Sequence, residues 1–202
     1  MFDDLLRAFK DRLLAPAARA LGPSCPPAVV TLCALAAGVA AAWLAAERSY
    51  AWALAAWLAN RVLDGLDGAV ARVHGRASDL GGYFDILCDF AVYALVPIGL
   101  VAGAPTAEGW RALAILLAAF YLNAASWLYL AAVLERRGRG AAVSGQLTSV
   151  AMPAGLIAGT ETIVFYTLFL LLPAQAVPLF LAMAALVLVG VTQRAVWAGR
   201  TL

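Results

Sequence analysis

Apolar residues fill most of the chain in long blocks that short polar breaks separate. A helix that crosses a lipid bilayer needs about 20 apolar residues, and six blocks are long enough to form one. Glycine and proline mark several of the breaks, at residues 103–105, at Gly138 and Gly140, and at Pro173. The predicted spans are residues 28–46, 50–73, 80–103, 110–134, 147–172 and 175–197.

The N-terminal 20 residues follow a different pattern, in which apolar positions recur at helical spacing and charges fill the other face. The apolar positions are Phe2, Leu5, Leu6, Phe9, Leu13 and Leu14. The pattern predicts an amphipathic helix over residues 2–20, which Pro23, Pro26 and Pro27 separate from the first span. Such a helix either lies on the membrane surface or packs on the bundle as a cytoplasmic extension, and the pattern favours neither.

The composition supports a membrane protein. Of the 202 residues, 64% are hydrophobic and 13% are charged, and the mean hydropathy is +0.88. Soluble domains typically carry about 25% charged residues, so these values exclude an ordinary soluble globule, a disordered chain and a collagen. We expect one all-α integral membrane domain over residues 1–202, with six transmembrane helices after the amphipathic juxtamembrane helix. The net charge of +2 gives no reason to expect a nucleic-acid partner.

Basic residues are distributed unevenly between the two sides of the membrane. With the N-terminus in the cytoplasm, 11 of the 14 Lys and Arg residues are cytoplasmic, Arg48 and Arg111 are outside, and Arg61 lies within a span. This asymmetry predicts that both termini are cytoplasmic. Tryptophans near span ends are typical of anchors at the membrane interface. Four fit this description: Trp52, Trp57, Trp110 and Trp197.

The second and third predicted spans contain four aspartates, Asp64, Asp67, Asp85 and Asp89. Each charge within the membrane costs roughly 2.5–3.5 kcal/mol on insertion scales, so either a positive group lies among them or they share protons. The first two are three residues apart and the last two are four apart, so each pair shares one helix face. Because a short connection makes the two helices antiparallel neighbours, we expect the pairs to converge near the cytoplasmic side.

Four carboxylates that face one another favour a site for Mg²⁺ or Mn²⁺, which prefer oxygen ligands. The three cysteines and the single histidine lack the spacing of a zinc site. Gly65 and Gly68 flank Asp67, and glycine lets either a ligand or a neighbouring helix approach closely. Arg72 is suited to a phosphate, although it also fits an ordinary cytoplasmic anchor.

The two acid pairs belong to one longer pattern of eight fixed residues within 26 positions. It reads Asp64-x2-Asp67-Gly68-x2-Ala71-Arg72-x8-Gly81-x3-Asp85-x3-Asp89. This pattern resembles the full signature of the CDP-alcohol phosphotransferases. The wider stretch NRVLDGLDGAVAR and the later GTET, residues 159–162, resemble the small bacterial members of that family.

The resemblance implies a metal-dependent enzyme of phospholipid biosynthesis. Such enzymes transfer a substituted phosphoryl group from a CDP-linked donor, usually CDP-diacylglycerol, to a small alcohol and release CMP. They are typically homodimers, and a bacterial member would lie in the cytoplasmic (inner) membrane with its active site facing the cytoplasm.

The same resemblance implies a role for each signature residue. Asp64, Asp67 and Asp85 would hold Mg²⁺ or Mn²⁺, and Asp89 would be the general base and also a metal ligand. The donor nucleotide would contact five residues, which are Asp64, Gly68, Ala71, Arg72 and Thr31. Thr31 is the weakest of these assignments, because a threonine at the start of a helix also suits capping.

The acceptor is expected to be a phosphorylated polyol, such as glycerol 3-phosphate or an inositol phosphate, with serine or an amino alcohol as the alternative. Arg136, Arg137 and Arg139 are candidates to hold its phosphate, although they also serve as a topology signal that touches anionic lipid. Glu161 in the fifth span either locks helices together, contacts a cationic acceptor, or pairs with Arg61 or another polar neighbour.

Three other functions compete with this interpretation. A carboxylate-lined cation transporter would spread its acids through the membrane and often repeat its halves, whereas here the acids cluster and no repeat is visible. A membrane prenyl transferase also uses aspartates with Mg²⁺, but the Gly-x2-Ala-Arg element favours a CDP donor. An inactive relative would have little reason to keep all four aspartates.

Overall fold

The computed structural model describes residues 14–22, 25–138 and 159–202, and all regular structure in these residues is helical. The helices are α2 (Pro27–Ala46), α3 (Tyr50–Val73), α4 (Asp79–Gly103), α5 (Ala107–Arg136), α7 (Gly159–Leu171) and α8 (Ala176–Thr201), with a 3-10 turn at Pro173–Gln175. Their bounds agree with the predicted spans to within a few residues wherever the chain is described. Residues 14–20 are also helical, whereas 2–13 and 147–158 lie outside the described residues.

Four helical segments of the described chain are long and apolar enough to cross a membrane, namely α2, α4, α5 and residues 173–201. This confirms the prediction of an all-α integral membrane protein. The helix α3 falls outside this group because Arg61, Asp64, Asp67 and Arg72 interrupt its apolar surface. The described part of α7 has 13 residues, which is shorter than a span.

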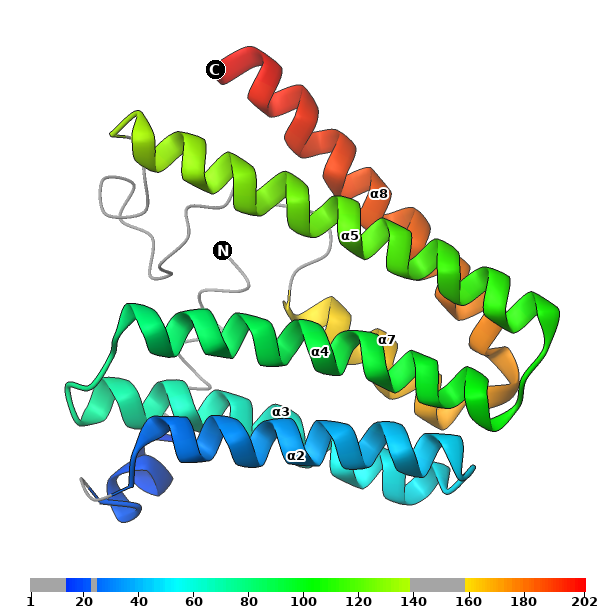
Figure 1. The fold of residues 1–202 in the computed structure, drawn as a ribbon, viewed down its shortest axis with the longest axis horizontal. Helices are drawn as coiled ribbons and strands as arrows, with labels where there is room; N and C mark the ends of the chain where they lie inside the picture. The colour runs from blue at the N-terminus through cyan, green and yellow to red at the C-terminus, as the bar shows by residue number, and fades with distance from the viewer. Residues whose placement is uncertain (1–13, 23–24, 139–158) are drawn as a thin grey trace. The chain divides into compact units, whose positions relative to one another are not determined.

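The chain divides into two compact units. Unit 1 contains Met1–Thr106 and Tyr166–Ala174, and unit 2 contains Ala107–Phe165 and Gln175–Leu202. In unit 1, α2 packs along both α3 and α4 (Figure 1). In unit 2, α5 packs along α8 (Figure 1). All four predicted site aspartates belong to unit 1.

Small residues allow α2 and α4 to approach closely. A Cβ atom added to Gly99 would lie 2.1 Å from the carbonyl oxygen of Ala42, and one added to Gly38 would lie 2.3 Å from Cγ2 of Val92. Membrane helices associate mainly through such close van der Waals packing, because lipid provides little hydrophobic drive between them. This packing fixes the position of α4, and therefore of Asp85 and Asp89, relative to α2.

A serine cap closes the turn between α3 and α4. Ser78 precedes α4, and its Oγ accepts a hydrogen bond of 3.1 Å from the backbone nitrogen of Gly81. At the other end of these helices, Arg48 adopts a φ of 58° and its Nε donates to the carbonyl oxygen of Gly103. The cap and this contact hold α4 at both ends.

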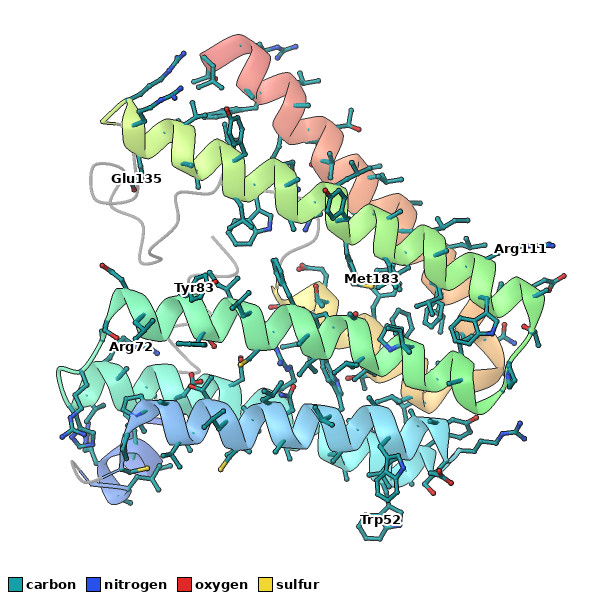
Figure 2. The ribbon with its side chains drawn as sticks, in the orientation of Figure 1. Trp52, Arg72, Tyr83, Arg111, Glu135 and Met183 are labelled. Atoms are coloured by element: carbon teal, nitrogen blue, oxygen red, sulfur yellow. The ribbon has the colours of Figure 1, made fainter. Side chains whose placement is uncertain are left out.

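The assignment of four tryptophans to the membrane interface is wrong at one position. Trp52 is 71% exposed and projects away from α3, as Figure 2 shows. Trp57, only five residues later, is fully buried. Its ring stacks on Tyr166 with centroids 5.0 Å apart, and its Nε1 donates to Thr167 Oγ1 at 3.3 Å. Trp57 is therefore a core residue of unit 1.

Candidate active site

The four predicted aspartates lie in one region of unit 1, Asp64 and Asp67 on α3 and Asp85 and Asp89 on α4. Cys88 of α4 lies within electrostatic range of all four carboxylates. The two helices are connected by residues 74–78, and each packs closely on α2, whereas α3 and α4 meet chiefly through side chains. Arg61 contacts one acid of each pair, Asp64 and Asp89, so α3 and α4 bring the two pairs near each other with α2 as the common support.

Asp67 is the most buried of the four aspartates, with 5% of its surface exposed. Its Oδ2 accepts a hydrogen bond of 2.7 Å from Thr31 Oγ1. Thr31 lies in the second turn of α2, which begins at Pro27 after Pro26 at the capping position. The prolines at the start of α2 thus place a hydroxyl donor against a signature carboxylate.

Of the two arrangements expected for the clustered acids, a positive group or shared protons, the structure shows a positive group, Arg61. Its Nη2 donates to Asp89 Oδ1 at 2.8 Å, and its Nη1 lies 3.7 Å from Asp64 Oδ2. The arginine thus bridges α3 and α4 with only 8% of its side chain exposed. Sequence reasoning noted the charge but did not assign it to the site. The available signal was its position three residues before Asp64, on the same helix face.

Neutral groups surround the same guanidinium on its other sides. Nε donates to Asn60 Oδ1 at 2.8 Å, and Nη1 donates to the Tyr93 hydroxyl at 2.8 Å. Asn60 is itself fixed, because its Nδ2 donates to the Ala34 carbonyl oxygen at 2.7 Å. The guanidinium carbon lies 4.8 Å from the Trp57 ring centroid and 5.0 Å from that of Tyr93, which is cation–π distance.

The aromatic residues form a buried layer beside the aspartates, on the side away from the α3–α4 turn. Tyr166 packs against both Trp57 and Tyr93, with centroids 5.0 and 5.3 Å apart, and its hydroxyl donates to the Tyr93 carbonyl oxygen. Phe169 extends the layer and is fully buried. Trp57, Tyr166 and Phe169 are fully buried, so this side of the guanidinium lies in apolar surroundings where hydrogen bonds are strong.

The glycine and arginine of the signature lie one helical turn apart near the end of α3. A Cβ atom added to Gly68 would lie 3.1 Å from Arg72 Nη1, so the guanidinium folds back over the glycine backbone. Arg72 is exposed and lies close to the α3–α4 turn, where Figure 2 labels it. Ala71 precedes it and is half-buried.

The predicted acceptor residues belong to unit 2. Arg136 is exposed at the end of α5, and Arg137 donates from Nη1 to the Leu202 carbonyl oxygen at 2.7 Å. Arg139 lies outside the described residues.

Besides Arg61 in unit 1, sequence reasoning also missed Arg194, which lies on α8 in unit 2. It is 6% exposed, its Nε donates to Ser126 Oγ at 3.0 Å, and its Nη2 donates to Asn123 Oδ1. Asn123 and Ser126 are polar residues three apart in an otherwise apolar helix, which was the signal for such a partner.

The donor set of unit 1 suits a divalent metal in its chemistry. Four carboxylates provide hard oxygen ligands of the kind that Mg²⁺ and Mn²⁺ prefer. Within residues 14–22, 25–138 and 159–202, no three His, Cys, Asp or Glu residues are arranged closely enough to hold a metal ion. Thr31 and Arg61 instead engage oxygens of Asp67 and Asp89. A metal would therefore have to draw the carboxylates together.

Residues 25–196 match the CDP-alcohol phosphatidyltransferase family, and the chain belongs to it. The protein is accordingly a membrane-bound transferase of phospholipid biosynthesis. Membership decides against the cation transporter and the prenyl transferase, and the matched region covers every described helix from α2 to most of α8.

Individual proteins are similar to this chain in sequence or in fold. Inner membrane protein YnjF of Escherichia coli (strain K12) is 40% identical over 159 residues, which are 75% of this chain and 72% of that protein. The crystal structure of Mycobacterium tuberculosis phosphatidylinositol phosphate synthase with CDP-DAG bound has a TM-score of 0.70 at 23% identity, covering 91% of this chain and 92% of that one. The same enzyme in complex with manganese and citrate has a TM-score of 0.68 at 21% identity, covering 90% and 87%. These two structures share the fold.

Proposed function

We propose that this enzyme transfers a phosphatidyl group from CDP-diacylglycerol to the hydroxyl of a phosphorylated polyol and releases CMP. Glycerol 3-phosphate and an inositol phosphate are the leading acceptors. The observation that carries the proposal is the gathering of the four signature carboxylates on α3 and α4, with Arg72 near the same helix end. The solved relative with CDP-DAG bound supports the choice of donor.

In the proposed reaction, Asp89 removes the proton from the acceptor hydroxyl. The resulting oxygen attacks the phosphorus that carries the diacylglycerol group and forms a new P–O bond. The bond from that phosphorus to the CMP oxygen breaks, and CMP leaves with the electron pair. An alcohol is a weak nucleophile until a base takes its proton, which is why a carboxylate must lie beside it.

The other signature residues hold the donor. Asp64, Asp67 and Asp85 are the proposed ligands of Mg²⁺ or Mn²⁺, with Asp89 as a further ligand. When bound, the cation would offset the negative charge of the diphosphate and of the departing CMP. Gly68, Ala71 and Arg72 contact the cytidine diphosphate, since the guanidinium over Gly68 is suited to pair with a phosphate. Thr31 contributes through Asp67.

Unit 2 contains arginines that are candidates to bind a phosphate. Arg194 is buried, and in the described part of the chain its partners are a neutral amide and a neutral hydroxyl. A buried cation is usually paired with an anion, so its charge remains available to a phosphate. Arg136, Arg137 and Arg139 remain candidates for the same task. Serine or an amino alcohol is the alternative acceptor.

The membrane arrangement is part of the proposal. We infer that α3 and the helix ending at Leu171 also cross the bilayer, which gives six spans in one domain over residues 1–202. Both termini and the active site then face the cytoplasm, with the amphipathic helix of residues 2–20 before the first span. The similarity to a bacterial inner membrane protein supports the cytoplasmic membrane as the location. A homodimer is the proposed assembly.

The test is CMP release by the purified protein in lipid micelles, with CDP-diacylglycerol, Mg²⁺ or Mn²⁺ and one acceptor at a time. We expect release that depends on a single acceptor, and loss of that release in Asp89→Asn with metal-dependent donor binding retained. Asp79→Asn is the matched control, because Asp79 is an exposed acid in the first turn of α4 and should retain activity. Normal turnover by Asp89→Asn would refute its role as the base, and absence of nucleotide binding would refute the proposed function.

A further inference from the structure

We propose that Arg61 is a positioning residue for this reaction, which holds Asp89 by one carboxylate oxygen and balances the charge of the aspartates before a metal binds. This inference rests on the proposed function, because it assigns Asp89 to the acceptor. It concerns a residue outside the eight-residue signature. Three properties of Arg61 support this role: the rigidity of its guanidinium, the asymmetry of its contacts with the acids, and its charge.

The guanidinium is held in one position by contacts from α3 and α4, and α2 supports it indirectly through Asn60. Asn60 and Trp57 lie on α3 itself, Tyr93 lies on α4, and Asn60 is anchored in turn to Ala34 of α2. With 8% of the side chain exposed, Arg61 has little freedom to follow a moving carboxylate. Movement would leave buried donors and acceptors without partners, which is energetically unfavourable. Arg61 therefore fixes the carboxylate rather than following it.

Arg61 treats its two acids differently. It makes a direct hydrogen bond of 2.8 Å to Asp89 Oδ1, whereas Asp64 Oδ2 is 3.7 Å away, beyond hydrogen-bond distance. Within the described residues, no hydrogen bond or ion pair reaches Asp89 Oδ2, and this side chain is 28% exposed. Oδ2 is therefore the oxygen that can receive a proton from an acceptor. Arg61 therefore gives Asp64 no direct hydrogen bond, and these two groups attract each other through charge.

The positive charge of Arg61 stabilises the carboxylates but repels a metal cation. A guanidinium within 4 Å of Asp64 and Asp89 stabilises both carboxylates while no metal is present. The same charge repels a divalent cation that the carboxylates would bind. Removing it should tighten metal binding and at the same time leave Asp89 free to rotate away from its working orientation. A residue that only held α3 to α4 would weaken both properties together.

The experiment compares four variants. Arg61→Gln removes the positive charge and the guanidinium's set of hydrogen bonds. Arg61→Lys keeps the charge but not that set of hydrogen bonds. Tyr93→Phe keeps every charge and removes the hydroxyl that accepts from Arg61 Nη1. Arg111→Gln is the control, because Arg111 is exposed at the start of α5, where Figure 2 labels it. The two measurements are kcat for CMP release and the Kd for Mn²⁺ by calorimetry without donor or acceptor.

We expect Arg61→Gln to lower kcat by about 10–100-fold, the usual effect of losing a residue that orients a ligand, and to lower the Kd for Mn²⁺. Arg61→Lys should return the Kd to near the wild-type value while kcat stays low. Tyr93→Phe should lower kcat with an unchanged Kd, and Arg111→Gln should change neither. If Arg61→Gln does not fold, the Lys and Phe variants decide the matter.

Two results would overturn the inference. One is a wild-type kcat in Arg61→Gln, or in both Arg61→Lys and Tyr93→Phe. The other is a fall in kcat accompanied by weaker Mn²⁺ binding in every variant, which is the signature of a merely structural role. Failure of the proposed function has a different signature, namely no CMP release by the wild-type protein. The Mn²⁺ titrations do not need turnover, so an unchanged or raised Kd in Arg61→Gln would still refute the charge effect.

Discussion

Replacing Thr31 by valine removes a single hydroxyl from the candidate site and keeps the shape of the side chain. The Thr31 hydroxyl has one proton and two acceptors within reach, Asp67 Oδ2 at 2.7 Å and the Pro27 carbonyl oxygen at 3.2 Å. The shorter contact goes to a charged, nearly buried carboxylate, so the proton is directed to Asp67. Thr31→Val therefore deprives a proposed metal ligand of the hydrogen bond that orients it.

The size of the effect follows from this bond. A hydrogen bond to a charged group contributes about 1.5–3 kcal/mol net, and each 1.36 kcal/mol is a factor of ten. We therefore expect the Mn²⁺ concentration that gives half-maximal CMP release to rise by about 10–100-fold. The KM for CDP-diacylglycerol at saturating Mn²⁺ should change little, because the lost bond orients a metal ligand.

Two further variants make the assay specific. Thr31→Ser keeps the hydroxyl and should restore the metal dependence. Thr192→Val is the matched control, because Thr192 Oγ1 donates only to the carbonyl oxygen four residues earlier, Leu188, at 2.9 Å. A raised KM for the donor with an unchanged metal dependence would refute this reasoning. It would show that Thr31 acts on the nucleotide, as the family resemblance implies.

Two more predictions concern the packing of unit 1 and the buried cation of unit 2. Gly99→Ala forces a methyl group towards the Ala42 carbonyl oxygen, so thermal unfolding in detergent should show a loss of about 1–3 kcal/mol or more, whereas Gly199→Ala, with open space around it, should be neutral or slightly stabilising. An unchanged Tm for Gly99→Ala would contradict the close approach of α2 and α4. If Arg194 binds a phosphate, glycerol 3-phosphate should raise the Tm of the wild-type protein but not that of Arg194→Gln. An equal rise in Tm for both proteins would argue against an anion at Arg194.

The helices could be predicted because local chemistry sets their ends. The bounds of α3 were predicted as residues 50–73, and α4 begins after the Ser78 cap and ends at Gly103, before Pro105. The local sequence pattern predicts the burial of individual side chains less well than it predicts the ends of helices. Trp57 resembles an interface anchor by its distance from the start of α3. Its burial depends on Tyr166, more than 100 residues later, and a helical pattern carries no information about that contact.

In the candidate site, too, local features could be predicted from the sequence and long-range contacts could not. The spacing of the aspartates predicted that they share helix faces and converge, because helical periodicity and a short connection are local properties. The arginine of unit 2 was not found, because Arg194 near the C-terminus counts equally well towards the positive-inside rule. Only its contacts with Asn123 and Ser126, about 70 residues earlier, reveal that it is buried.

Electrostatics alone predicted that the acids either share protons or surround a positive group, and it did not identify that group. Lysine and arginine would both offset the charge, and either could lie on any neighbouring helix. The contacts explain why an arginine serves here, since Nε, Nη1 and Nη2 each donate to a different residue while the flat face lies against Trp57. A lysine ammonium is a point charge with no such fork and no flat face to stack. The arginine therefore combines charge balance with a fixed orientation, and the Arg61→Lys variant separates these two contributions.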